Sequence, residues 1–359
     1  MSRNLITMMI IVITSFIMTG CNDAKINNIK SDENNKIVTN HETGTSESST
    51  KVSDDDLPSK IIEKSKYFEI KKGKLIRYKG GFSNSAVVKL PSEVKSIGKE
   101  AFALTKKEKS IPIGRLQTIY LKIPKDVRLD KFAFTGIGPM NLSFEDGRKK
   151  IEDFAFQDAA ENNTESTIRI PDSVKVLGKH SFYHSINGSY LVVYMGNGVE
   201  RLEEGALAGG IDIDKLPSSL KYMGKESLNG CGALPGGGLP ESLEVIESQA
   251  ISELSDGKIQ IPSKVKRIAP GAVSWLEDAS DIGYSVSKDN RYFKSDKNGW
   301  LYSKDGKELF FAVLRTGEEG TSKSYENKVP SSVKIIHKKG LVYDPDGNGK
   351  ASIKAIKDH

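Results

Sequence analysis

Four Ser-x-x-Lys pairs have the spacing used in acyl transfer, where a lysine lies beside a serine nucleophile at a helix start. They are Ser92/Lys95, Ser218/Lys221, Ser263/Lys266 and Ser331/Lys334. All four recur at the same offsets of an internal repeat, and the motifs that accompany this pair in penicillin-binding proteins are absent from the sequence. We therefore interpret the pairs as a product of the repeat and expect no acylating serine.

His180 and His184 are four residues apart and could share one face of a helical turn, as metal ligands do. The glutamate of a zinc-protease motif is missing and no third ligand is evident, so we expect surface histidines. The sequence also has no phosphate-binding glycine loop, dinucleotide fingerprint or nucleophile elbow. We expect a protein that is not an enzyme and needs no cofactor.

Asp344, Asp346 and Asn348 are spaced like the first oxygen ligands of an EF-hand calcium loop. Position twelve of such a loop supplies a bidentate glutamate, and here it is Ala355. We favour a solvated Asp/Gly turn over a calcium site, and we expect no metal centre elsewhere.

The element that must position these residues is a repeat. The segment Leu90–Phe102 (LPSEVKSIGKEAF) returns as Ile170–Phe182 (IPDSVKVLGKHSF), and similar units begin at Leu216, Leu239 and Ile261. Counted from the proline as zero, apolar residues fall at +3 and +6, a small residue at +10 and a large apolar residue at +11. The zero positions are residues 91, 124, 145, 171, 196, 217, 240 and 262. This spacing lies mostly in the range of leucine-rich repeats.

Each unit carries an alternating strand before its zero position, as in Thr118–Ile123 and Thr167–Ile170. Proline lacks the N–H that a strand ladder needs, so it ends the strand. A single unit cannot cover its own apolar face, whereas stacked units form a continuous core. The pattern therefore predicts a curved β-solenoid with parallel strands along one side.

These units resemble the BspA-like subfamily of bacterial leucine-rich repeats, from about Phe68 to Val273 and again at 329–336. The resemblance implies a leucine-rich-repeat solenoid that is mainly β, with short turns or helical pieces on its convex side. We assign residues 60–276 to this solenoid and its N-terminal cap, 277–328 to a β-hairpin insertion, and 329–359 to a last partial repeat and tail. Members of the family include binders of host proteins and matrix.

The N-terminus has the layout of a secretory signal peptide, with Arg3 before an apolar stretch from Leu5 to Met18. Residues 18–21 (MTGC) resemble the lipobox of bacterial lipoproteins, which implies that residues 1–20 are removed and Cys21 is acylated. The alternatives are an uncleaved anchor or a plain secretory signal. The lipid chains imply an exported protein anchored at the cell membrane or cell surface.

Residues 21–59 are polar and charged, with almost no large apolar side chains, so we expect a lipid-anchored disordered linker. The chain has two cysteines. If Cys21 carries lipid, Cys231 has no partner for a disulfide, and we interpret it as a small buried apolar residue.

Alternation predicts which strand residues point outward, onto the concave face that solenoids use for binding. The outward positions one residue before the inward end of each strand are Lys89, Lys122, Ser143, Arg169, Tyr194, Lys215, Gly238, Gln260 and Lys328. Five of these nine are cationic, and Tyr120 lies two positions behind Lys122. We take Lys89, Tyr120, Lys122, Arg169, Tyr194 and Lys215 as candidate ligand-binding residues.

A basic stripe with tyrosines suits an acidic protein segment, an acidic glycan or a wall polymer, and export argues against nucleic acid. The competing interpretation is that the lysines only keep the sheet soluble and block edge pairing. We expect a cell-surface binding module or adhesin. The alternative is a structural or assembly scaffold of the bacterial envelope, and the sequence leaves the oligomeric state open.

Overall fold

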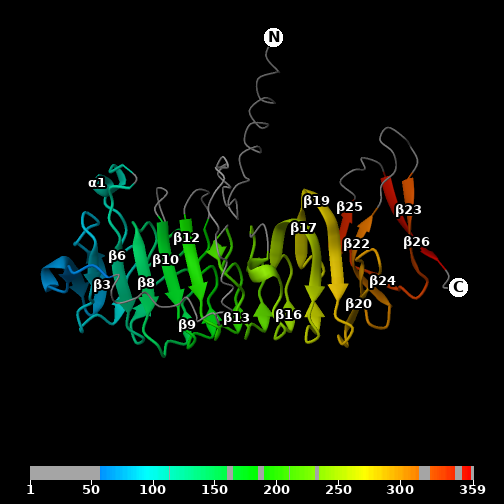
Figure 1. The fold of residues 1–359 in the computed structure, drawn as a ribbon, viewed down its shortest axis with the longest axis horizontal. Coiled ribbons are helices and arrows are strands. Elements are labelled where there is room, and N and C mark those ends of the chain that lie inside the picture. The colour runs from blue at the N-terminus through cyan, green and yellow to red at the C-terminus, as the bar shows by residue number, and fades with distance from the viewer. Residues whose placement is uncertain are drawn as a thin grey trace, which may run out of the picture.

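The computed structural model describes residues 57–112, 114–159, 165–184, 190–209, 211–230, 234–314, 324–343 and 350–356. The chain winds into a β-solenoid of about ten turns with almost no helix, which confirms the predicted leucine-rich-repeat architecture. Figure 1 shows the turns lying side by side in chain order along one long axis. The only α-helix among the described residues is the single turn α1 (Lys106–Lys109).

One side of the solenoid is a seven-stranded parallel sheet, in which each strand pairs with that of the next turn. Its strands are β1 (Ile61–Ile62), β4 (Ala86–Val88), β6 (Ile119–Ile123), β8 (Met140–Phe144), β10 (Glu165–Ile170), β12 (Tyr190–Met195) and β14 (Asp212–Ile213). Burial alternates along them, as in β6, where Ile119, Leu121 and Ile123 are buried. One face of this long-strand sheet is therefore core and the other is surface.

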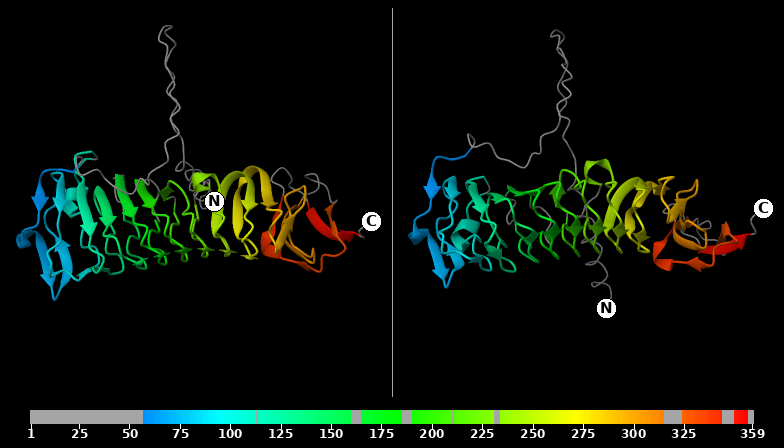
Figure 2. Two further views of the ribbon diagram at one scale, coloured as in Figure 1. Left: turned by 60° about the horizontal axis from the view of Figure 1, so that its bottom comes forward. Right: turned by 90° about the horizontal axis from the view of Figure 1, so that it is seen from below.

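The opposite side carries strands of only two residues, which fall at offsets +5 and +6 in most units. They are β5 (Ser96–Ile97), β7 (Arg128–Leu129), β9 (Lys150–Ile151), β11 (Val176–Leu177), β13 (Arg201–Leu202), β15 (Tyr222–Met223), β16 (Val245–Ile246) and β18 (Arg267–Ile268). Strands β9, β11, β13, β15, β16 and β18 form one parallel sheet, and β5 and β7 extend the antiparallel N-terminal hairpin of β2 (Phe68–Lys71) and β3 (Lys74–Tyr78). We call this side the short-strand side, and Figure 2 shows the row of turns from two other directions.

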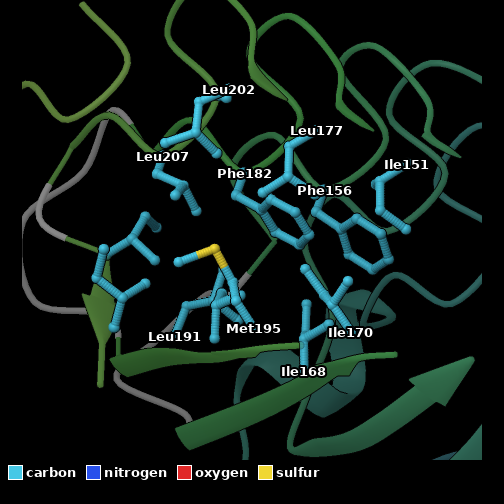
Figure 3. Close-up of a cluster of buried hydrophobic side chains, with 14 of the residues drawn as sticks. Ile151, Phe156, Ile168, Ile170, Leu177, Phe182, Leu191, Met195, Leu202 and Leu207 are labelled. Atoms are coloured by element: carbon cyan, nitrogen blue, oxygen red, sulfur yellow. The ribbon is translucent and has the colours of Figure 1, made fainter. Parts of the chain in front are cut away.

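Side chains from the two sides meet in a core that runs through the stack. Phe102, Phe134, Phe156 and Phe182 occupy offset +11 or its equivalent, and all four are buried. Their rings are stacked in sequence, with centroids 5.4, 4.6 and 5.0 Å apart. Figure 3 shows Phe156 and Phe182 between the long-strand residues Ile168 and Ile170 and the short-strand residue Leu177. Each buried phenylalanine contributes about 1.5–3 kcal/mol through burial alone.

The residue two positions before this core residue has a left-handed backbone in each of eight turns. The eight are Glu100, Phe132, Phe154, His180, Gly205, Glu226, Gln249 and Gly271, with φ between 47° and 70°. The N–H of Glu100 donates to the carbonyl of Phe132 in the next turn, and each later left-handed residue that has a following turn donates likewise, either to the left-handed residue of that turn or to the residue before it. The left-handed turn thus aims a donor at the neighbouring unit, which offsets the conformational cost of about 1–2 kcal/mol per non-glycine residue.

The C-terminal part departs from this geometry. Strands β17 (Ile251–Ile261) and β19 (Val273–Val286) are long and pair in parallel, and β19 runs across residue 277, where the repeat pattern predicts the start of an insertion. Strands β20 (Phe293–Ser295), β21 (Leu301–Ser303) and β22 (Glu308–Leu314) are antiparallel, and β24 (Ile335–Ile336) and β25 (Leu341–Tyr343) pair with β22. Strand β23 (Ser324–Pro330) pairs with β26 (Lys350–Ile356), and three 3-10 turns lie at Ser65–Tyr67, Pro235–Gly237 and Lys338–Gly340.

One core position holds a charge that the repeat pattern did not predict. Arg148 stands at offset +3, where most other units have valine or leucine, and it is 5% exposed. Its Nη1 lies 2.9 Å from an oxygen of Glu152, its Nη2 donates to the carbonyl of Val127, and its guanidinium lies 5.3 Å from the Phe144 ring. Hydrogen bonds and a carboxylate thus offset part of the desolvation of this arginine, whose buried Nε has no hydrogen-bond partner among the described residues.

We predict that Gly205→Ala destabilises the solenoid by more than about 1 kcal/mol, because φ at this residue is +60° and an added Cβ would lie 2.3 Å from Nδ1 of His180. Glu226→Gly at the same repeat position should change stability by no more than about 1 kcal/mol in either direction, since relief of strain opposes the added chain entropy. Urea unfolding followed by circular dichroism checks both. Equal urea midpoints for Gly205→Ala and the parent would contradict the requirement for a left-handed backbone at this repeat position.

We predict that Glu152→Ala destabilises the protein by about 2 kcal/mol, less than for a fully buried pair because the Glu152 side chain is 29% exposed. Arg148→Val should be neutral or stabilising, since valine is the residue of the neighbouring units at this position. Thermal unfolding of the two variants and the parent provides the measurement. The account of this pair fails if Arg148→Val is the more damaging change.

Candidate binding surface

The outward residues of five neighbouring long strands form two rows across the sheet. In the first row the strand register aligns Val87, Tyr120, Asn141, Thr167 and Val192. In the second row it joins Lys122, Ser143, Arg169 and Tyr194, and Lys89 follows β4 directly. We call these ten residues the basic face. It contains three cations and two tyrosines, and carboxylates lie only at its margin: Asp212 pairs with Val192 in the next strand, and Glu165 precedes Thr167 by two residues.

Arg169 lies at the centre of the basic face. Its Nη1 donates to Oδ1 of Asn141 at 2.7 Å, and its guanidinium lies 5.0 Å from the ring centroid of Tyr194. Partial burial lowers the pKa of Arg169 below its ordinary value, and the nearby Tyr194 and Tyr120 oppose this shift. A guanidinium stays protonated in any case, so the strands hold a fixed, partly desolvated positive charge here.

Lys89 and Lys122 are exposed, and neither forms an ion pair within the part of the chain that the structure describes. Lys122 is two strands away from Arg169, across Ser143. Lys89 and Lys122 belong to adjacent turns and repel one another unless an anion lies between them, so this arrangement favours binding of an acidic group.

Lys215 lies outside these rows. The register of β12 with β14 ends at Val193 and Ile213, and one further step brings Asp214 beside Tyr194. Lys215 is half-buried, and its Cβ lies 3.0 Å from where a Cβ would stand on Gly236. Among the candidate residues, Lys89, Tyr120, Lys122, Arg169 and Tyr194 share one surface, and Lys215 does not join them.

The short-strand side has charges of both signs. Glu200 lies between Lys175, at 3.4 Å, and Lys221, at 2.9 Å, while Glu244 lies 2.5 Å from Lys266 in the turns that follow. The lysines lower the pKa of Glu200 and Glu244, chiefly through side-chain hydrogen bonds from Lys221 and Lys266. These five residues all stand at offset +4, so charge alternates there from turn to turn. Such exposed pairs neutralise the surface and contribute little to stability.

The other sequence candidates form no site in the structure. Lys221 and Lys266 pair with glutamates of the preceding turns, as described above, and Nζ of Lys95 donates to the Ser92 backbone carbonyl at 3.2 Å. The expectation of surface histidines is wrong for His184, which is buried with Nδ1 3.8 Å from Asp158. Burial at this position follows from its place just after the core Phe182.

Several predicted residues lie outside the described part of the chain. They are Cys21, Cys231, Asp344, Asp346 and Asn348. Within the described ranges, no three histidine, cysteine or carboxylate side chains are grouped as a metal site would require. No helix in those ranges has the length and apolar character needed to span a membrane.

The stacked turns with their parallel strand sheet define a leucine-rich-repeat solenoid. More particularly, residues 115–213 and 149–277 match the description of a BspA type leucine rich repeat region, in six copies. The repeat region of this chain is therefore of the BspA type. This confirms the resemblance found in the sequence.

No curated protein matches the chain in sequence. Among solved structures it is similar to a leucine-rich repeat protein from Eubacterium ventriosum, with 17% identity over 60% of this chain and 50% of that one and a TM-score of 0.34. It is also similar to the pneumococcal vaccine antigen PcpA, with 16% identity over 75% of this chain and 57% of that one and a TM-score of 0.32. A third similar structure is that of a leucine rich cell surface protein from Faecalibacterium prausnitzii, with 16% identity over 73% of this chain and 67% of that one and a TM-score of 0.30. The chain thus spans about half the length of the first of these proteins.

Proposed function

We propose that this chain is an exported, lipid-anchored surface protein that binds an acidic partner, a protein segment or an acidic glycan or wall polymer, through the basic face. The observation that carries the proposal is the contrast between the two sides of the solenoid. The basic face presents three cations and two tyrosines with the carboxylates Asp212 and Glu165 only at its margin, whereas the short-strand side intersperses lysines with glutamates and aspartates. A BspA-type repeat region supports a binding or surface role without enzymatic chemistry.

The geometry favours an extended partner. The rows cross five parallel strands, and neighbouring strands of a sheet are about 4.8 Å apart. Lys89, Lys122 and Arg169 therefore form a line of positive charge across the sheet, with Tyr194 at its end. Tyrosine and arginine are the side chains that most often dominate binding energies at protein surfaces. The lysines add long-range attraction that salt screens over about 10 Å at 0.1 M.

The envelope-scaffold alternative makes a different prediction for the same surface. A scaffold would bind its envelope partners and retain no affinity for a soluble acidic ligand. The charge-reversal experiment below therefore separates the two.

We predict that Lys89→Glu/Lys122→Glu weakens binding of the full chain to its acidic ligand at least about tenfold, because two attractions become repulsions. The assay is an array of matrix proteins, acidic glycans and wall polymers, read at two salt concentrations. Binding by the parent should also weaken as salt is raised.

The matched control is Lys95→Glu/Arg128→Glu. These residues are exposed, lie on the short-strand side of the same two turns, and give the same change in net charge. The control should bind like the parent. Equal loss in both variants would mean that only net charge matters, and binding by neither the parent nor the control would favour the scaffold alternative.

We predict that the chain produced in a bacterial host incorporates labelled palmitate and that Cys21→Ser abolishes the label. In lipoproteins with such a lipobox the cysteine thiol receives the first acyl chains, and a serine hydroxyl is a much weaker nucleophile than a thiolate. Cys231→Ser is the control and should keep the label. Labelling that survives Cys21→Ser would refute anchoring at this residue.

A further inference from the structure

A second surface feature lies far along the chain from the basic face, on the short-strand side. A groove of about 440 Å³ opens where the turns that begin at Pro240, Pro262 and Ser287 meet. It is a groove open to solvent and not an enclosed pocket, so its lining side chains decide what it can bind. Tyr292 is the only aromatic residue among the seven that line it, and the others are charged or polar.

Tyr292 presents a ring to solvent where an equivalent tyrosine is covered. Tyr222 occupies the same offset, +5, and the Arg201 guanidinium of the preceding turn lies 3.9 Å from its ring centroid. The corresponding residue before Tyr292 is Arg267, whose Nη2 instead lies 2.6 Å from Glu247. Tyr292 is 49% exposed, among the three most exposed large apolar side chains of the described residues.

The turn that carries Tyr292 is fixed by hydrogen bonds of the buried Asn290 side chain. Asn290 is 1% exposed, and its Nδ2 donates to the carbonyls of Pro262 and Val265 at 2.8 and 2.9 Å. Its Oδ1 accepts from the backbone N–H groups of Tyr292 and Phe293, both at 2.8 Å. Four hydrogen bonds from one buried amide fix this turn, so a ligand that packs on Tyr292 needs to order little of the protein.

The charges around the ring leave a positive excess. Lys266 is neutralised by Glu244 at 2.5 Å, as described above. Lys264, Arg291 and Asp289 also line the groove, and none of the three forms an ion pair within the described ranges. Two cations outside any ion pair, Lys264 and Arg291, and the carboxylate Asp289 therefore surround the exposed ring together with Ser263, and the charge of Lys264 also acts on Glu244.

We infer that this groove binds a short saccharide that carries a carboxylate, such as a uronic acid. A sugar ring has an apolar C–H face that can pack on Tyr292, and its hydroxyl groups are partners for Asp289 and Ser263. Lys264 and Arg291 attract its carboxylate. A purely apolar ligand would need a more apolar lining than this groove offers. The site is separate from the basic face and does not depend on the function proposed for it.

The test is an isothermal titration calorimetry experiment in which a disaccharide that contains one uronic acid is titrated into the full chain. Tyr292→Ala should weaken binding about tenfold, and Tyr292→Phe should retain it because the ring remains. Lys264→Ala/Arg291→Ala should weaken binding of the acid by a similar factor. The same disaccharide with its carboxylate reduced to an alcohol should bind the parent less tightly, by about the factor lost in that double variant.

Specific results would overturn the inference. These are no binding at millimolar disaccharide, binding unchanged in Tyr292→Ala, or acetate binding as tightly as the disaccharide, which would indicate a simple anion site. The variant Lys89→Glu/Lys122→Glu should bind the disaccharide like the parent. If it alone loses binding, the saccharide occupies the basic face and not this groove. Because Tyr292 is exposed, its variants should unfold at the same temperature as the parent. This measurement verifies that a loss of binding is not a loss of folding.

Discussion

The whole structure depends on stacking, because no single turn of this chain can bury its own apolar face. Each turn must therefore present the same inward residues at the same offsets, which aligns the stacked rings from Phe102 to Phe182 and the left-handed residues before them. The same register aligns what points outward. Surface residues of different repeats thus lie in rows, and the chemistry of a row follows from one position read across several turns.

Much of this was predictable because the apolar pattern repeats. The offsets gave the solenoid, the inward core and the alignment of Lys122, Arg169 and Tyr194. Lys215 escaped the pattern because Ile213 and Leu216 are both buried three residues apart, so strict alternation ends there and Asp214 continues the row. The burial of Arg148 was not predicted because its pairing with Glu152 is a contact in space that the repeat pattern does not encode. The exposed ring of Tyr292 was not predicted because it depends on Arg267 pairing with Glu247.

The two sides of the solenoid show how one repeat can serve two purposes. On the short-strand side, Lys175, Glu200 and Lys221 alternate in sign across successive turns and form ion pairs at the surface. On the long-strand side, the basic face keeps one sign of charge, and Asn141 and Tyr194 hold Arg169 in place. Like charges on neighbouring strands are unfavourable in the isolated protein, and an acidic partner would relieve that repulsion.

The central claim is that the partner contacts the basic face, and site-specific photo-crosslinking in the producing cell tests it most directly. A benzophenone amino acid would replace Ser143, on the basic face, or Lys149, which is exposed six residues later in the same turn on the other side. The account predicts a crosslinked adduct from position 143, reduced by added salt, and none from position 149. An adduct from position 149 alone would contradict it.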